Sequence, residues 1–347
     1  MTVTASSTHA ATAGSDRDPA RIRWLIFARD RGIFVLWAIL LAGFSIWAQP
    51  YFASVDNAIL IANAAAMTAV FAAGIAVGIF CGALDLSIPG TAALAGCCCG
   101  WLITHGAPTW TGIGAGLALG VLAGLVNGLI TLRGFNPIVV TIGTLSAMSG
   151  LAAAIAGGYT IPGLDALSFM GTQRYLGVPA PVWIVAALFA VGTVFLTRTR
   201  DGIRMMAVGG NTEAVRRSGV HSDRYKVLGF VISGFCAALG GLVTAALVTE
   251  ASPAANPGII FNALTAVALA GVSLSGGRGS LPRVLVGALI LGTIANALTI
   301  KGVQPYWATA VTGVLLLASL GVEKSVSTSV SRRLVTSAHA CAHTGTR

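Results

Sequence analysis

Residues 197–226 read TRTRDGIRMMAVGGNTEAVRRSGVHSDRYK and form the longest polar run between two apolar stretches of the chain. The run carries seven basic and three acidic residues. Asn211 is a favourable helix N-cap and Gly219 a favourable helix terminator, so we expect a short helix over residues 212–218. A helix of one or two turns is marginal in water and needs a surface on which to dock. We interpret the run as a cytoplasmic loop that carries a docking helix, and an ordinary solvated loop remains the alternative.

Composition places the rest of the chain in a membrane. Of the 347 residues, 55% are hydrophobic and only 9% are charged, whereas about a quarter of the residues in soluble domains are charged. A net charge of +10 would suggest nucleic-acid binding in a soluble protein. In a polytopic membrane protein the positive charge follows topology instead, so we expect a membrane as the partner and no nucleic acid.

Crossing a bilayer takes about 20 apolar residues. Ten stretches of the chain qualify: residues 32–52, 58–83, 88–104, 112–132, 138–156, 181–196, 227–248, 259–274, 284–300 and 306–322. The sequence therefore predicts an all-α, polytopic helical bundle with a transmembrane domain over residues 32–322. The basic segment 1–31 and the polar segment 323–347 are predicted to be disordered and cytoplasmic. Glycine is frequent in the spans, above all in residues 112–132, which predicts close packing between helices.

The basic residues fix the predicted orientation. With the N-terminus inside, 19 Lys and Arg residues lie on the cytoplasmic side. Two, Arg174 and Lys301, lie outside. This asymmetry favours an even number of spans and places both termini and the loop 197–226 in the cytoplasm.

Two segments repeat at a fixed distance. Residues 131–137 (TLRGFNP) match residues 299–305 (TIKGVQP) position by position, at an offset of 168 residues. The Pro-Gly pairs at 89–90 and 257–258 share this offset. Five predicted spans separate the members of each pair, so the two halves would be inverted in the membrane, as in many transporters. We predict inverted repeats at about 58–156 and 227–322; a coincidence of two ordinary loop ends is the alternative.

Polar side chains are rare in the predicted spans, and each is therefore a candidate for the path of a solute. Asp85 lies at a predicted break between two spans and is either a gate residue or a helix cap. Asn127 either meets a polar solute or forms a hydrogen bond between helices. The full set of candidates for the translocation path is Asp85, Ser87, Asn127, Asn262, Thr265 and Asn296.

The sequence shows no catalytic constellation. No G-x-x-x-x-G-K-[ST] motif occurs, so the chain lacks a phosphate-loop lysine. The Gly-rich residues 271–280 are interpreted as a re-entrant segment or a break between helices. The six cysteines show no metal-ligand spacing with His or acidic residues. We expect neither an enzyme nor a chain with a cofactor or a metal site of its own.

Four stretches together resemble one family. They read DLSIPG (85–90), NPIVVTIG (136–143), GGNTEAVRRSG (209–219) and ALTAVALAG (263–271), the last running into SGGRGS (275–280). Through these four stretches together, the chain resembles the permease subunit of ribose-type ABC sugar importers, the branch for ribose, xylose, arabinose and autoinducer-2. The resemblance extends over about residues 31–322.

The resemblance implies partners and a site. It implies a homodimer of permeases, ATP-binding subunits on the cytoplasmic side that bind the ATP, and an extracytoplasmic sugar-binding protein. It also implies a coupling helix that contacts the ATP-binding subunit through Asn211, Thr212, Glu213, Ala214, Arg216, Arg217, Ser218 and Gly219.

Three positions depart from the family pattern and bear on the substrate more than on the class of protein. DLSIPG stands where the family usually reads like DLSVGS, Asn262 stands where an acid is common, and Ala270 stands where a second glycine is. The sparse Asn, Ser and Thr residues of the spans suit a neutral sugar.

The leading hypothesis is an ABC-importer permease for a monosaccharide-like solute in the bacterial inner membrane. An ion-coupled secondary transporter is the alternative, although it would want acids embedded in the membrane and only Asp85 lies near its interior. A non-transporting membrane scaffold or enzyme is a third possibility, which the missing catalytic clusters and the repeat disfavour.

Overall fold

The computed structural model describes residues 19–273 and 276–321, with side chains from Arg31 onward. The predicted tail 323–347 and residues 1–18 lie outside the described residues. The long helices are α1 (Pro19–Trp47), α2 (Val55–Phe80), α3 (Ile88–Thr104), α4 (Thr109–Leu132), α5 (Pro137–Ile155), α7 (Ala180–Arg198), α8 (Arg200–Gly210), α10 (Ser222–Val248), α11 (Gly258–Leu269) and α12 (Leu281–Ile300). A further apolar helix spans Pro305–Gly321.

Short elements complete the described chain. They are η1 (Asp165–Leu167), α6 (Ser168–Gly171), α9 (Thr212–Arg217), and the strands β1 (Arg174–Tyr175) and β2 (Val178–Pro179), which pair antiparallel. The predicted all-α class is confirmed, because the strands are only two residues long. Sequence reasoning treated residues 157–180 as a loop and missed η1, α6 and this hairpin.

Six helices are long and apolar enough to cross a membrane, counting only the described residues. These are α2, α4, α5, α7, α10 and α12. Four shorter apolar helices, Arg31–Trp47 within α1, α3, α11 and Pro305–Gly321, occupy the positions of the other four predicted stretches. The structure is therefore a helical bundle of membrane type, and six of its described helices are long enough to cross a bilayer.

Two predicted boundaries need correction. Helix α1 begins at Pro19, inside the segment that the sequence predicted to be disordered up to residue 31. Proline is well suited to the first position of a helix, and the apolar residues 24–27 between the arginines allow the helix to start there. Helix α11 ends at Leu269 rather than 274, and Gly271 follows with a φ of +66°. This left-handed conformation ends the helix, and the predicted break is confirmed for residues 271–273 and 276–280; residues 274–275 lie outside the described residues.

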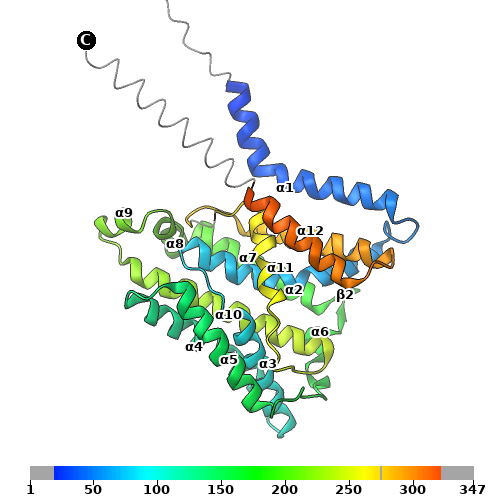
Figure 1. Cartoon of the computed structure of the whole chain (residues 1–347), viewed down its shortest axis with the longest axis vertical. Coiled ribbons are helices and arrows are strands. Elements are labelled where there is room, and N and C mark those ends of the chain that lie inside the picture. Colours follow the sequence, from blue (N-terminus) through cyan, green and yellow to red (C-terminus); the bar gives the residue numbers. More distant parts are fainter. Residues whose placement is uncertain (1–18, 274–275, 322–347) are drawn as a thin grey trace, which may run out of the picture.

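Helix α10 lies at the centre of the bundle, between α2 and α4 (Figure 1). It packs most extensively against α4, through a row of glycines on α4. Added Cβ atoms on Gly120 and Gly124 would overlap the α10 backbone at Gly234 and Phe230, and one on Gly128 would lie 2.9 Å from the Cα atom of Val227. The absence of side chains lets the two backbones touch, as the glycine content of residues 112–132 predicted.

The 168-residue offset found in the sequence also relates the helix bounds. It carries α2 onto α10, α3 onto α11, α4 onto α12 and α5 onto Pro305–Gly321, each boundary within four residues. Packing follows the same correspondence. Gly124 of α4 contacts α10, and Gly292 of α12, 168 residues later, would place a Cβ atom 3.0 Å from the Cβ atom of Ala65 on α2.

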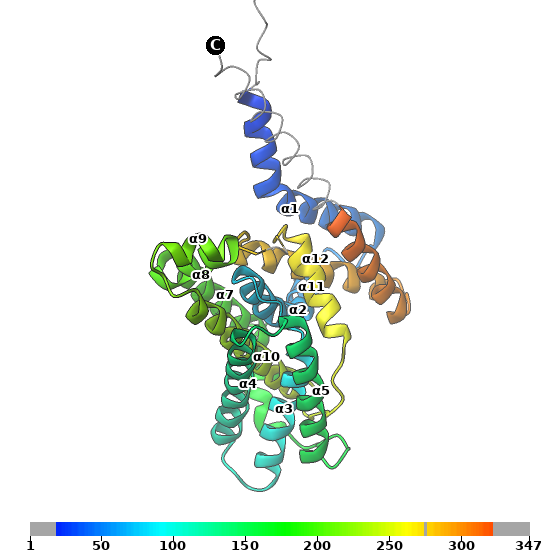
Figure 2. The ribbon, with the colours of Figure 1, turned by 60° about the vertical axis from the view of Figure 1, so that its left-hand side comes forward.

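The two ends of α10 meet different parts of the chain. Its N-terminal end contacts α8 and α9, whereas its C-terminal half lies beside the C-terminal half of α3. An added Cβ atom on Gly96 would lie 3.5 Å from the carbonyl oxygen of Gly241, and one on Gly100 would lie 3.3 Å from the Cβ atom of Ala251. With 27 residues, α10 is about 40 Å long. The last turn of α3 is thus far from α8 and α9, as Figure 2 shows.

Candidate functional site

The predicted docking helix is present as α9. Its N-cap is Asn211, whose side-chain oxygen accepts a hydrogen bond of 2.9 Å from the N–H of Ala214. Ser218 is the C-cap, and Gly219 adopts a φ of +81° directly after it. Cap, helix and terminator therefore lie within one residue of where the sequence predicted them.

The polar side of α9 is open. No residue of the helix is buried, and Val215 and the following Val220 are only partly buried where they pack on the main core. Arg217 donates to Glu213 at 3.0 Å and Arg216 to Asp223 at 3.5 Å, but these pairs are exposed and contribute little stability. Two valines thus hold α9 against the main core, and its charged side chains are exposed. All the residues predicted for coupling lie in it or in its caps: Asn211, Thr212, Glu213, Ala214, Arg216, Arg217, Ser218 and Gly219.

Helix α8 precedes α9 in the same polar run, and sequence reasoning missed it. Thr199 caps it, accepting a hydrogen bond of 3.0 Å from the N–H of Gly202, and Met205 and Val208 are buried one turn apart. The Thr199 cap and this three-residue spacing are typical of a helix and could have indicated α8. The glycines at 202, 209 and 210 lower the helix propensity of this segment, and so the helix was not predicted.

Tyr225 fixes α8 to α10. Its hydroxyl donates to Asp201 at 2.9 Å and accepts from Arg204 at 3.3 Å, and the residue is 3% exposed. The hydrogen bond to Tyr225 raises the pKa of Arg204 above its ordinary value. Both partners of the tyrosine lie on α8, so these hydrogen bonds connect α8 to the N-terminal turn of α10.

The far end of α8 touches the break that follows α2. A Cβ atom on Gly209 would overlap the carbonyl oxygen of Phe80 and lie 2.8 Å from the backbone nitrogen of Gly277, in the bend after α11. Gly277 has a φ of +71°. Three backbones therefore meet at Gly209, where a residue with a side chain would not fit.

A buried hydrogen-bonded network starts in that break. The Oδ1 atom of Asp85 accepts from the N–H of Ser87 at 2.9 Å and from its hydroxyl at 2.6 Å. Asn127 on α4 donates to the Ser87 hydroxyl oxygen at 3.0 Å and accepts from the Thr144 hydroxyl on α5 at 2.5 Å. The network joins the α2–α3 break to α4 and α5.

The network leaves polar atoms unpaired. Asp85 Oδ2 and the hydroxyl oxygen of Ser233 on α10 lie close enough to interact, but neither makes a hydrogen bond of standard geometry within the described residues, and both side chains are fully buried. No group of three His, Cys, Asp or Glu in residues 31–273 and 276–321 could hold a metal ion. Asp85 is therefore a lone buried carboxyl group in the part of the chain that the structure describes.

The structure brings together only half of the residues predicted for the translocation path. Asp85, Ser87 and Asn127 lie in one network, all buried. Asn262 is exposed on α11, and Thr265 is buried and donates to the Phe261 carbonyl of its own helix at 2.6 Å. Asn296 on α12 is partly buried with its amide oxygen unpaired. Thr144 belongs to the network and was missed, because the sequence does not show which of the threonines in the apolar spans faces a polar group on a neighbouring helix.

We expect Thr144→Val to destabilise the protein by about 1–3 kcal/mol, since it leaves the buried amide oxygen of Asn127 without a donor. The matched control is Thr141→Val, one turn earlier on α5, whose hydroxyl bonds only to carbonyls of its own helix. The two variants are compared by thermal unfolding in detergent. Equal midpoints for both variants would mean that the network does not stabilise the fold.

Comparison with known proteins gives a consistent set of relatives. Residues 57–320 match the family described as "Branched-chain amino acid transport system / permease component". The chain is 35% identical over 292 residues to the L-arabinose transport system permease protein AraH of Escherichia coli, which covers 83% of this chain and 88% of that protein. It is 31% identical over 312 residues to the ribose import permease protein RbsC of Haemophilus influenzae, covering 88% and 95%. It is 30% identical over 326 residues to the D-allose transport system permease protein AlsC of Escherichia coli, covering 92% and 99%. No solved structure matches significantly.

Proposed function

This chain belongs to the family of transport permease components that it matches over residues 57–320, and on that premise we propose that it is the membrane subunit of an ABC importer. In this proposal it passes a monosaccharide-like solute inward across the bacterial inner membrane. The energy comes from separate ATP-binding subunits, and a binding protein delivers the solute outside. The observation that carries the substrate class is the similarity to permeases named for L-arabinose, ribose and D-allose, at 30–35% identity over most of each chain.

The family description names branched-chain amino acids, which are zwitterions, and this second substrate class needs a test. A buried path for a zwitterion needs groups that pair with its carboxylate and its ammonium. Among the described residues Asp85 is the only ionisable acid or base that is buried, apart from Tyr225 and the cysteines. Neutral amide and hydroxyl groups dominate the buried polar residues, which favours a neutral, hydroxyl-rich solute.

We propose that α9 is the coupling helix. It is short, capped and open to solvent on its polar side, as a docking element must be. A push on α9 would pass through α8 to two contacts, Tyr225 on α10 and Phe80 at the end of α2. The second contact adjoins the break that contains Asp85, and from there the network reaches α5 through Asn127. Packed helices rearrange between discrete positions, so a push on α9 would switch the protein between its inward-open and outward-open states.

We further propose ten spans, with both termini in the cytoplasm and two inverted repeats. The distribution of Lys and Arg supports the orientation, with 19 inside and two outside. The 168-residue correspondence of helix bounds and of the Gly124 and Gly292 contacts supports the repeats. The family supports a dimer of two such chains in the assembled importer.

Two measurements test the proposal. A tagged full-length chain purified from native membranes is expected to bring with it an ATP-binding subunit. Right-side-out vesicles that contain the complex and its binding protein are expected to take up D-ribose, L-arabinose or D-allose when loaded with ATP. Uptake of L-leucine and of none of the three sugars would assign the chain to the other substrate class.

An ion-coupled transporter is the second candidate function. Such a transporter would use a buried carboxyl group with an unpaired oxygen, and Asp85 is such a group. In ATP-loaded vesicles, an uncoupler that dissipates proton and sodium gradients is expected to leave uptake unchanged. Uptake that collapses with the gradients and persists without ATP would establish the secondary transporter instead.

A further inference from the structure

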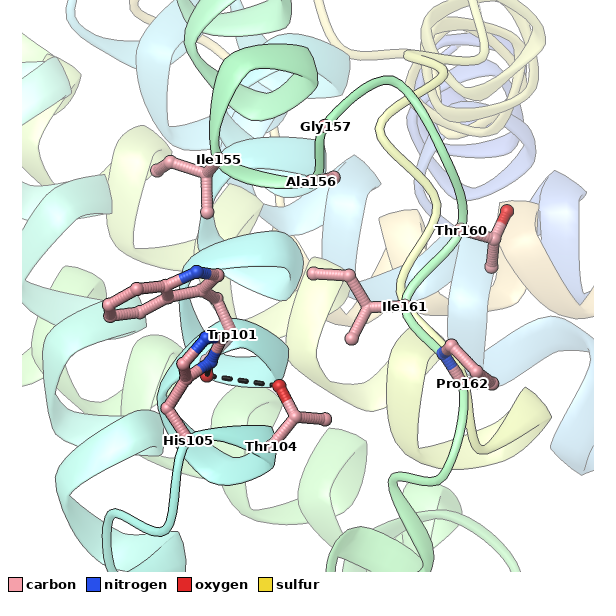
Figure 3. A pocket seen from close by; sticks show the side chains of 9 residues that line it. All are labelled: Trp101, Thr104, His105, Ile155, Ala156, Gly157, Thr160, Ile161 and Pro162. Atoms are coloured by element: carbon pink, nitrogen blue, oxygen red, sulfur yellow. Dashed lines mark hydrogen bonds between the residues drawn. The ribbon is translucent and has the colours of Figure 1, made fainter.

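A cavity of about 510 Å³ opens at the end of the bundle that lies away from α9. It lies between the last turn of α3 and the segment 155–162, which ends α5 and continues into the following loop (Figure 3). It is wide open to solvent, so a bound solute would keep much of its surface hydrated, as in a low-affinity site. No acidic or basic side chain lines it other than His105.

One wall of the cavity is an aromatic pair. The rings of Trp101 and His105 stack with centroids 4.2 Å apart, and Trp101 is 42% exposed. The Nδ1 atom of His105 lies 2.8 Å from the Trp101 carbonyl oxygen. Donation from Nδ1 to this carbonyl leaves Nε2 as a hydrogen-bond acceptor that is free for a ligand.

Two donors of the lining residues are unpaired. Neither the indole N–H of Trp101 nor the hydroxyl group of Thr160, at the opposite edge of the cavity, has a hydrogen-bond partner within the described residues. In Figure 3 the side chain of Ile161 points toward Trp101 across the opening. His105 covers one face of the Trp101 ring, and the cavity thus offers the part of this ring that stays exposed, an apolar side chain across the opening, and separate donors and acceptors.

The walls are held in place before any ligand arrives. Ile161 and Ala251 exchange two backbone hydrogen bonds of 2.9 Å, and the N–H of Leu164 donates to the Thr249 carbonyl at 2.9 Å. An added Cβ atom on Gly100 would lie 3.1 Å from the Leu164 side chain, so α3 packs directly on this loop. Such preorganisation lowers the entropy cost of binding.

We propose that this cavity is a low-affinity subsite for a monosaccharide on the extracytoplasmic side, where the solute stacks on Trp101 as it enters the permease. A sugar has apolar C–H faces that pack on an aromatic ring and hydroxyl groups that both donate and accept, which matches this set of walls. The lack of charged lining groups matches a neutral solute. The subsite rests on the proposed function and adds to it the place where the solute first contacts this chain.

The test is protection of a cysteine placed in the cavity. Thr160→Cys is labelled from outside with a membrane-impermeant maleimide, in the full-length chain assembled with its ATP-binding subunits in vesicles. The matched control is Leu176→Cys, at the tip of the β1–β2 hairpin, where Leu176 is 92% exposed and outside the cavity. The unsubstituted chain provides the background, because its described cysteines are buried or partly buried.

D-ribose, L-arabinose and D-allose are supplied without a binding protein, at up to tens of millimolar. At least one is expected to slow the labelling of Thr160→Cys about threefold, as expected when about two-thirds of the sites are occupied. L-leucine should not slow it, and no sugar should protect Leu176→Cys. Adding Trp101→Ala should abolish the protection, and Trp101→Phe, which keeps a ring face, should retain part of it.

Protection by a binding protein but by none of the sugars alone would overturn the proposal and make the cavity a docking surface. Equal labelling with and without every probe would also overturn it. Uptake in the same vesicles separates this failure from failure of the proposed function. Sugar uptake by the wild type without protection of Thr160→Cys rejects the subsite alone, whereas absence of any sugar uptake rejects the importer.

Discussion

Arg216→Pro is expected to lower ATP-driven uptake about a hundredfold while the protein still inserts into the membrane, because proline inside a helix costs about 3 kcal/mol. Arg216 lies in the last turn of α9, where proline removes a helical N–H donor and its ring meets the carbonyl four residues earlier. The side chain is exposed, so no packing is lost with it. Uptake and ATP hydrolysis are measured in the same vesicles, and hydrolysis is expected to lose its response to the loaded binding protein.

Arg216→Ala is the matched control. It removes the same charge and the exposed pair with Asp223, but it keeps the helix. Uptake by this variant should fall by no more than about fivefold, since an exposed charged side chain is worth less than about 1 kcal/mol. The difference between the two variants therefore measures the helix itself and not the side chain that the resemblance assigns to the contact with the ATP-binding subunit. If both variants transport normally, α9 is a solvated loop element and not the coupling helix.

Gly124→Ala is expected to destabilise the folded protein by about 3 kcal/mol or more, which is the upper range for overpacking. The added methyl group would overlap the Phe230 carbonyl group and the Cα atom of Val231 on α10. These are backbone atoms in a long helix and cannot rotate away as a side chain could. The yield of monodisperse protein in detergent and its thermal unfolding midpoint should both fall.

Gly114→Ala on the same helix is the control, because an added Cβ atom at Gly114 meets nothing within 4 Å. Alanine favours a helix over glycine by about 1 kcal/mol, so this variant should be as stable as wild type or slightly more stable. Equal behaviour of the two variants would mean that α4 and α10 do not pack as closely as described.

The parts of the fold that follow from local rules could be predicted from the sequence. Hydropathy located the apolar helices, and α3 has the bounds predicted for it, Ile88–Thr104. A capping residue and a glycine located α9. Helix α8 was not predicted because of its glycines. Gly209 above all is needed for a tertiary contact with Phe80, and no local sequence pattern indicates this contact.

The residues of the candidate site could be predicted from the sequence in part, but their contacts could not. Asp85 stands out as an acid in an apolar chain, and Asn127 as an amide within a span. Their connection through Ser87 to Thr144 depends on how α3, α4 and α5 are placed side by side, which periodicity does not encode. The cavity beside Trp101 likewise combines residues about 60 positions apart.

The most direct test of the account is accumulation of a sugar in liposomes that contain this chain with and without its ATP-binding subunits. The sugar, its binding protein and the ion gradients are held constant. We predict accumulation against the gradient only when the ATP-binding subunits and ATP are both present. Accumulation by the chain alone, without nucleotide, would contradict the claim that force reaches it through α9.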